Sequence, residues 1–204
     1  MNPWAGPMGA EYATRNVHDT DERARAFTSI LDSQPGIRSA VELGCGRGTN
    51  LAALRRALPA APLIGVEINQ HAYDLACALF PVATNPVVGL YCTDILAAGD
   101  AFCSAMRSDL ALTCGLLIHI PPERLPRAYE VLDLVGRRWI LMCEYFCPKP
   151  REIPYRDGAF CGARDFAGEF LDAYPAWSLV SSRFLYKREW PAFDNVTAFL
   201  MERR

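Results

Sequence analysis

The sequence predicts a single α/β domain built on a mostly parallel sheet, with helices on both faces and an antiparallel hairpin at one edge. Five short apolar runs alternate with helical segments along most of the chain, which is typical of parallel strands buried on both faces. Two strand-like segments near the C-terminus indicate the hairpin. A glycine-rich turn, residues 44–48, follows the first apolar run and predicts a ligand site at the carboxyl ends of the strands.

Composition narrows the class of protein. The chain has 204 residues, 51% of them hydrophobic, and a net charge of −2. These values argue against a disordered chain and against a strongly basic nucleic-acid binder. No apolar run reaches the ~20 residues of a membrane span, and the N-terminus shows no charged-then-apolar leader. We therefore expect a cytoplasmic protein, a monomer or homodimer, with a small-molecule substrate and neither nucleic acid nor a membrane as partner.

The eight cysteines indicate reduced, buried thiols. None forms a Cys-x-x-Cys pair, and most lie in apolar runs such as 112–114 and 141–143. Cys143 and Cys147 have no second pair or histidine cluster to complete four ligands, so no metal site is expected.

The N-terminal residues 1–36 predict a helical cap or lid over the domain. Regular character begins over 10–16, and a second helix is expected over 19–32. Acids open this second helix, and Phe27 and Ile30 lie on its apolar face.

Residues 37–146 form the predicted ligand-binding core. Its strand runs are short and continuously apolar, and prolines or a capping asparagine bound the helices. The expected strands are 39–43, 63–67, 87–91, 109–113 and 139–143. The expected helices cover 49–58 and 69–79, with Asn69 as N-cap of the second, and another opens at 121–123.

Residues 147–204 form the third part of the domain. Prolines and glycines make 147–163 a long loop, of a length that compact domains keep for a function. A helix is expected over 163–173, and the segments 177–186 and 195–202 predict the edge hairpin.

The residues in and around the glycine turn indicate which ligand it binds. Residues 44–48 read G-x-G-x-G, whereas the dinucleotide fingerprint is G-x-G-x-x-G and needs a glycine at Thr49. Glu42, on the strand before the turn, would repel a pyrophosphate but could pair with an ammonium group. Glu67 ends the second strand at the spacing of a ribose-binding acid. An adenosine with a positive centre and no phosphate describes S-adenosylmethionine, so the sequence predicts this cofactor and S-adenosylhomocysteine as its product.

These residues resemble the motifs of class I S-adenosylmethionine-dependent methyltransferases, and the resemblance implies their Rossmann-like seven-stranded sheet. Residues 42–48 look like the first motif and Glu67 like the ribose acid. Asp94 with Ile95 looks like the adenine contact, and 113–116 like the turn under the methionine. The positions carried over as cofactor-binding, with the N-terminal lid included, are Glu42, Gly44, Cys45, Gly46, Asn50, Glu67, Ile68, Asp94, Ile95, Thr113, Tyr12 and Arg15.

A narrower resemblance runs nearly end to end. The chain is similar to the pseudaminic acid biosynthesis-associated methylases in six segments: Trp4–Asn16, Gly65–Asn69, Leu117–Pro121, Glu144–Phe146, Glu152–Arg156 and Arg164–Glu169. The family name implies an amino-sugar setting without fixing the substrate of any member. Two departures, Arg47 in the turn and Cys161-Gly162 in the loop, affect the shape of the pocket.

Polar residues after the fourth and fifth strands are the candidates for the methyl acceptor. His119, Glu144 and Tyr145 are the predicted catalytic residues, since a proton must leave an amine or hydroxyl acceptor. The predicted substrate-binding residues are Glu144, Glu152, Tyr155, Arg156 and Arg164, with Asp157 beside them. Because carboxylates dominate this set, we favour N-methylation of a guanidine or amine, such as an arginine-like amino acid or an amino sugar.

Several alternatives stay open. Among methyltransferases, the alternative is O-methylation of a sugar or hydroxylated metabolite. Outside the methyltransferases, the alternatives are an NAD(P)-binding reductase and a non-catalytic protein that binds an adenosyl ligand. Among the residues, His119 could be hydrogen-bonded to backbone, Glu144 could be a solvated strand end, and Asp94 could be a turn residue. The segment 12–16 could be an ordinary amphipathic helix.

Overall fold

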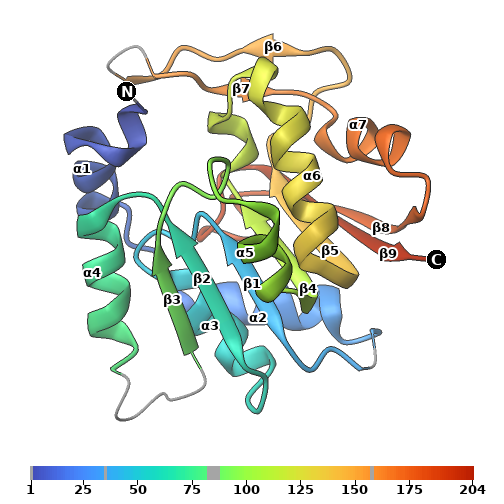
Figure 1. Cartoon of the computed structure of the whole chain (residues 1–204), viewed down its shortest axis with the longest axis horizontal. Helices are drawn as coiled ribbons and strands as arrows, with labels where there is room; N and C mark the ends of the chain where they lie inside the picture. Colours follow the sequence, from blue (N-terminus) through green and yellow to red (C-terminus); the bar gives the residue numbers. More distant parts are fainter. Residues whose placement is uncertain (1, 35, 82–87, 157–158) are drawn as a thin grey trace.

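The structure, a computed structural model, describes residues 2–34, 36–81, 88–156 and 159–204. Its centre is a seven-stranded sheet with the strand order β3-β2-β1-β4-β5-β9-β8 (Figure 1). Strands β1 to β5 are parallel to their neighbours, whereas β9 is antiparallel to both β5 and β8. The strands are β1 Ala40–Leu43, β2 Leu63–Glu67, β3 Val88–Cys92, β4 Ser108–Cys114, β5 Gly136–Glu144, β8 Trp177–Leu185 and β9 Val196–Arg203. The predicted sheet and its C-terminal antiparallel pair are confirmed.

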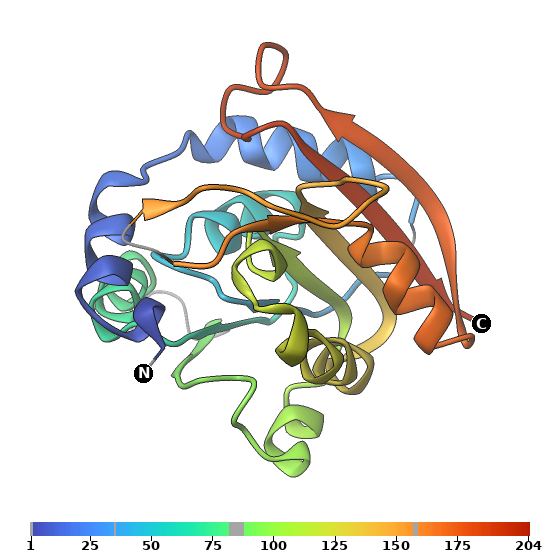
Figure 2. The ribbon, with the colours of Figure 1, turned by 90° about the horizontal axis from the view of Figure 1, so that it is seen from above.

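Helices cover both faces of this sheet (Figure 2). They are α1 Pro7–Arg15, α2 Thr20–Leu31, α3 Thr49–Ala57, α4 Gln70–Leu79, α5 Asp100–Ala105, α6 Leu125–Val135 and α7 Phe166–Ala173, with short 3-10 turns η1 Pro3–Ala5, η2 Leu117–His119 and η3 Pro122–Arg124. The predicted cap of α4 is confirmed, because Oδ1 of Asn69 accepts a hydrogen bond of 3.2 Å from the amide of Ala72.

The structure corrects two predicted helices. The helix expected to start at 163 begins at Phe166, because Ala163 pairs with Arg151 in a small antiparallel ladder. This ladder joins β6 Arg151–Glu152 to β7 Gly162–Ala163, so the segment predicted as a loop has a paired stem. The helix expected to open at 121–123 begins at Leu125, after the separate turn η3.

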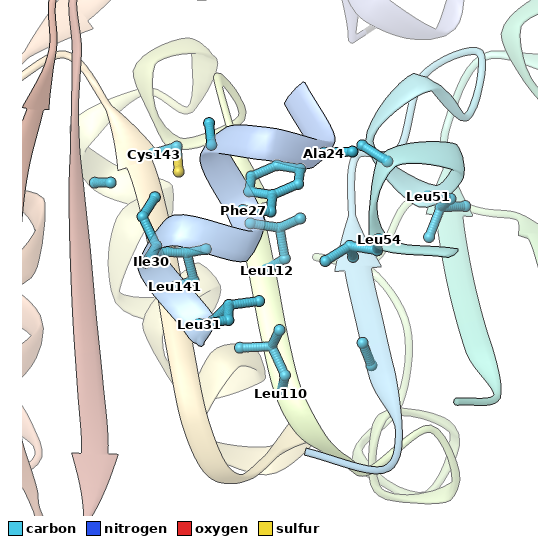
Figure 3. Close-up of a cluster of buried hydrophobic side chains, with 14 of the residues drawn as sticks. Ala24, Phe27, Ile30, Leu31, Leu51, Leu54, Leu110, Leu112, Leu141 and Cys143 are labelled. Atoms are coloured by element: carbon cyan, nitrogen blue, oxygen red, sulfur yellow. The ribbon is translucent and has the colours of Figure 1, made fainter. Parts of the chain in front are cut away.

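Strand alternation explains why both faces are covered. On β4, Leu110 and Leu112 face one core while Ala111 faces the other. The first core lies under α2, whose Phe27 packs among these leucines (Figure 3). The second core holds the apolar face of α6, including Leu132. A continuously apolar strand is therefore satisfied on both sides, as the sequence pattern predicts.

The N-terminal segment is held beside α4. The side-chain amide of Asn69 donates to the carbonyl oxygens of Trp4 and Gly6, each at 2.9 Å, so the residue that caps α4 also fixes the start of α1 (Figure 1). Gly9 makes this approach possible, because a Cβ built there would lie 2.1 Å from the carbonyl oxygen of Trp4. Helix α1 thus packs at the carboxyl end of β2, which leads into α4.

No helix in the described part of the chain is long and apolar enough to cross a membrane.

Candidate functional site

The turn after β1 has the backbone conformation that its glycines predict. The φ angles of Gly44, Gly46 and Gly48 are +70°, +55° and +83°, in the left-handed region that glycine enters at little cost. A Cβ added at Gly44 would lie 2.8 Å from Cδ1 of Leu116, whereas one at Gly46 would meet nothing within 4 Å. The turn therefore packs closely against the segment after β4 and leaves open space over Gly46.

Glu67 lies across this turn at the end of β2. Its Oε2 accepts a 2.8 Å hydrogen bond from the amide of Gly46, and its Oε1 accepts one of 2.8 Å from the amide of Asn69. Burial raises the pKa of the Glu67 carboxyl. Each carboxylate oxygen has a second lone pair, so Glu67 can accept further hydrogen bonds from a ligand hydroxyl.

Glu42 is wholly buried beneath the turn and connects to a chain of polar side chains. Its Oε1 accepts a 2.6 Å hydrogen bond from Nδ2 of Asn50, and Oδ1 of Asn50 accepts one from the guanidinium of Arg23. Oε2 of Glu42 has no hydrogen-bond partner among the described residues. Burial raises the pKa of Glu42 to about 8. This buried carboxyl therefore has an unused acceptor oxygen, and its hydrogen bond to Asn50 connects it to the surface of the site.

Arg23 is a site residue that the sequence prediction missed. Its Nη1 also lies 3.5 Å from Sγ of Cys114, and its Nη2 donates to the carbonyl oxygen of Ala192 at 2.7 Å. The pKa of the Cys114 thiol is lowered to about 6, first by its hydrogen bond with Cys143 on the neighbouring strand and also by the charge of Arg23. The helical spacing could have indicated that Arg23 is buried, because it lies four residues before Phe27 and therefore on the same face of α2.

These segments surround a cavity, called here the central cavity, at the carboxyl ends of β1, β2 and β4. Strand order reverses between β1 and β4, which is where open α/β sheets bind ligands. The N-terminal segment closes one side. The lining residues are Trp4, Gly9, Tyr12, Ala13, Gly44, Gly46, Glu67, Ile68, Ala72, Cys114, Gly115, Leu116, His119 and Ile120.

Several predicted cofactor residues line this cavity or the hollow beside it. Tyr12, Gly44, Gly46, Glu67 and Ile68 line the central cavity. Cys45 and Asn50 line an adjoining hollow on the other side of the turn. The N-terminal segment is therefore an amphipathic helix and also a wall of the cavity. Arg15 lies exposed outside it, with its guanidinium carbon 5.7 Å from the centre of the Tyr12 ring.

The remaining predicted cofactor residues lie elsewhere. Oδ1 of Asp94 accepts a 3.0 Å hydrogen bond from the amide of Leu96, and its Oδ2 is 3.3 Å from Nη2 of Arg124, so Asp94 is at least a turn residue and an ion-pair partner. Ile95 packs in the core, and Thr113 is buried within β4. None of these three lines the central cavity, and their contact with a cofactor stays a prediction.

His119 lines the central cavity. Its Nδ1 lies 3.1 Å from the carbonyl oxygen of Phe160. A carbonyl oxygen only accepts, so the neutral ring carries its proton on Nδ1 and leaves a lone pair on Nε2. Burial lowers the pKa of His119 to about 4, which keeps the ring neutral. The ring packs against Trp4 at 4.2 Å and Tyr155 at 4.9 Å between centroids.

Glu144 ends β5, as the sequence predicts, but its side chain is buried. It is 1% exposed, and its two carboxylate oxygens accept hydrogen bonds from the amides of Leu116 and Ile118, at 3.2 and 3.4 Å. Burial raises its pKa to about 8. The alternative of a solvated strand end is wrong, because Glu144 is buried and holds the turn that carries His119. The predicted contact of Glu144 with the acceptor stays a prediction. Tyr145 is half-buried next to Glu144, and burial raises its pKa to about 12.

The predicted substrate residues of the loop do not line one common cavity. The ring of Tyr155 packs at an angle of 55° against that of His119, whereas Glu152 and Arg164 line a separate hollow. Arg164 is held by Glu169, with 2.7 Å between Nε and Oε1. Arg156 is exposed, and Asp157 lies outside the described residues.

A second hollow, called here the side hollow, adjoins the central cavity. The two share Trp4 and His119. The side hollow is lined by Asn2, Pro3, Trp4, His119, Pro121, Arg124, Ala159 and Phe160. Within the described ranges, no group of three or more histidine, cysteine or acidic side chains is placed to hold a metal ion.

Sequence comparisons give limited information. No family model matches the chain. An uncharacterized 37.1 kDa protein in transposon TN4556 of Streptomyces fradiae is 32% identical over 127 residues, a match that covers 58% of this chain. The match spans about a third, 34%, of the length of that curated relative.

Comparison with solved structures is more informative. The magnesium protoporphyrin IX methyltransferase of Synechocystis PCC 6803 with bound S-adenosylmethionine is similar with a TM-score of 0.70 and 14% identity, over 100% of this chain and 95% of that one. CalS10 of Micromonospora echinaspora, an amino pentose methyltransferase also solved with S-adenosylmethionine, is similar with a TM-score of 0.67 and 12% identity, over 95% and 96% of the two chains. At these identities the likeness shows the fold, which is that of the class I methyltransferases.

Proposed function

We propose that the chain is an S-adenosylmethionine-dependent methyltransferase acting on a small polar metabolite. The observation that carries the proposal is the hydrogen bond of 2.8 Å between Glu67 and the amide of Gly46. It puts a carboxylate at the edge of the central cavity, against a turn whose glycines leave space for a ligand. The solved structures that share the fold and hold S-adenosylmethionine support the same reading.

The residues present fit this cofactor. Glu67 would accept the ribose hydroxyls, and Tyr12 and Ile68 would cover the adenosine from the sides of the cavity. Asn50, which lines the adjoining hollow, and the unpartnered Oε2 of Glu42 beneath it would accept hydrogen bonds from the ammonium of the methionine end. When bound, the cofactor supplies a methyl group on a positively charged sulfur. The G-x-G-x-G spacing of the turn, in place of the G-x-G-x-x-G of dinucleotide-binding proteins, argues against the reductase.

His119 is the residue that we assign to the acceptor. At neutral pH its Nε2 holds a lone pair, and the ring lines both the central cavity and the side hollow. It can therefore accept a hydrogen bond, and then the proton, from an amine or hydroxyl. Among N-acceptors an amine is favoured over a guanidine, because Glu144, which was to pair with a guanidinium, is buried under η2. An O-methyltransferase for a hydroxylated metabolite is the second candidate, since the same Nε2 serves a hydroxyl.

An amino sugar or an amino acid-like amine is the acceptor class that we favour within this proposal. The resemblance to the pseudaminic acid biosynthesis-associated methylases points to amino sugars, and CalS10 is described as an amino pentose methyltransferase. We also propose the division into a cap (1–36), a cofactor-binding core (37–146) and a substrate part (147–204), and a cytoplasmic location with reduced thiols.

Calorimetric titration of the purified protein with S-adenosylhomocysteine and with NADH tests the proposal. We expect saturable binding of S-adenosylhomocysteine and none of NADH; binding of NADH alone would overturn it. Incubation of a metabolite extract with radiolabelled S-adenosylmethionine then separates an enzyme from a binding protein. Cofactor binding without methyl transfer to any metabolite would favour the non-catalytic alternative.

A further inference from the structure

The side hollow is placed to receive the acceptor. It meets the central cavity at Trp4 and His119, so a molecule in the side hollow can present one end to the ligand of the central cavity. His119 is fixed at this junction, because its Nδ1–H is held by the carbonyl of Phe160 and its ring lies against Trp4. His119 thus lines both spaces.

The side hollow has one strongly polar cation in its wall. Its titratable lining residues, among those described, are His119, which is neutral, and Arg124. Asn2 adds an amide, and the other lining residues are apolar or contribute backbone. Away from His119, the chemistry of the lining is therefore that of a guanidinium beside flat apolar surfaces.

The guanidinium of Arg124 has N–H donors that make no hydrogen bond among the described residues. Its Nη2 pairs with Asp94 at 3.3 Å, and in the described part of the chain no other hydrogen bond uses its guanidinium. Both side chains of that pair are partly exposed, at 38% and 28%, so the pair is a weak one. A guanidinium carries five N–H donors in a planar fork that matches the two oxygens of a carboxylate or phosphate.

We propose that the side hollow binds an anionic group of the acceptor through Arg124. The acceptor then carries a phosphate or carboxylate at one end and the amine or hydroxyl to be methylated at the other, near Nε2 of His119. This inference deepens the proposed function and rests on it for the identity of the second end as a methyl acceptor. It makes Arg124, which the sequence did not indicate, the residue that selects the substrate class.

Three matched probes test the proposal: glucosamine, glucosamine 6-phosphate and glucosaminic acid. They share an amino-polyol skeleton and differ in carrying no acid, a phosphate or a carboxylate. Binding to the full chain, with and without saturating S-adenosylhomocysteine, is measured by calorimetry. We expect at least one acidic probe to bind about tenfold or more tightly than glucosamine, as a charged hydrogen-bonded pair provides. Which acidic probe gains identifies the anion.

Arg124→Gln should remove this preference, and Arg124→Lys should keep part of it, because an ammonium retains the charge without the fork. Arg127→Gln is the matched control, since Arg127 lies on α6 one turn away and is already paired with Asp100 and Glu130. Thermal unfolding of each variant shows that it is folded.

The outcomes separate this proposal from the proposed function. Equal binding of all three probes, no binding of any, or an unchanged preference in Arg124→Gln overturns the anion site. If S-adenosylhomocysteine binds in the same titrations, only this inference fails. If S-adenosylhomocysteine does not bind but the Arg124-dependent preference is present, the anion site stands and the methyltransferase proposal falls.

Discussion

Arg23 donates a 2.7 Å hydrogen bond to the carbonyl oxygen of Ala192, which ties α2 to the connection between β8 and β9. The preceding residue, Glu22, accepts a 3.0 Å hydrogen bond from the amide of the same Ala192. Two neighbouring side chains thus hold both backbone groups of one residue in a distant segment. Because Arg23 also reaches Asn50, the C-terminal hairpin is connected through it to the floor of the glycine turn.

Replacing Arg23 should therefore destabilise the protein far more than an ordinary surface change. Arg23→Gln removes the donors to Ala192 and Cys114, and leaves a buried polar chain incomplete. We expect a loss of about 3 kcal/mol in the free energy of unfolding, measured by denaturant titration. Arg25→Gln, an exposed change on the same helix, should cost less than about 0.5 kcal/mol. Equal losses for the two variants would contradict the role given to Arg23.

Glu67 is expected to carry much of the cofactor affinity. Glu67→Ala removes the acceptors for the ribose and also for the amides of Gly46 and Asn69. We expect binding of S-adenosylhomocysteine to weaken by about 1–3 kcal/mol, measured by calorimetry. Asp74→Ala, on the nearby α4, is the control. Unchanged affinity in Glu67→Ala would show that the ribose lies elsewhere.

The sheet, the turn and Glu67 could be predicted because their signals are local in the sequence. Apolar runs specify buried strands whatever surrounds them, and positive φ at Gly44 and Gly46 follows from the residue type. The end of a parallel strand is also fixed in space once the sheet is known, which places Glu67 at the cavity.

The rest depends on contacts between distant segments. The sequence placed Glu144 correctly at the end of β5, but the facing direction of its side chain depends on the η2 turn that follows β4, and this turn buries it. No local pattern marks Arg124, because Trp4 and Phe160, which line the side hollow with it, come from distant segments. Pairing of Arg151 with Ala163 likewise has no local pattern, since only two residues on each side take part.

Glu144 gives a prediction on pH. Its folded pKa is about 8, whereas a glutamate in the unfolded chain titrates near 4.5. Between these values the folded protein keeps a proton that the unfolded chain has released, so this group makes the free energy of unfolding fall as pH rises. Its stabilising contribution is complete below pH 4.5 and is lost by about pH 8.

Glu144→Gln should flatten that dependence, because an amide has no proton to release in this window. Denaturant unfolding of wild type and variant at intervals from pH 5 to 8 measures the difference. We expect the advantage of the wild type to shrink as pH rises. Glu123→Gln, an exposed change nearby, should run parallel to the wild type. A constant difference between wild type and Glu144→Gln would mean that Glu144 is ionised in the folded protein throughout.

His119 should act as a neutral base well below the usual range for histidine. Its pKa is lowered to about 4, so Nε2 keeps its lone pair at pH 6, where an ordinary histidine is largely protonated. An NMR titration, with the resonance assigned by its loss in His119→Asn, should show no protonation of this ring between pH 5 and 8.

The His119→Asn variant also tests the role of His119 as a base. Asparagine can still donate to the carbonyl of Phe160 but offers no basic nitrogen. Methyl transfer to an acceptor found in the extract assay should fall by about 10²- to 10⁴-fold, with the affinity for S-adenosylhomocysteine little changed. His71→Asn, outside the cavity, is the control. Full turnover in His119→Asn would assign this residue to shaping the junction between the two spaces, and the proton would have to leave by another route.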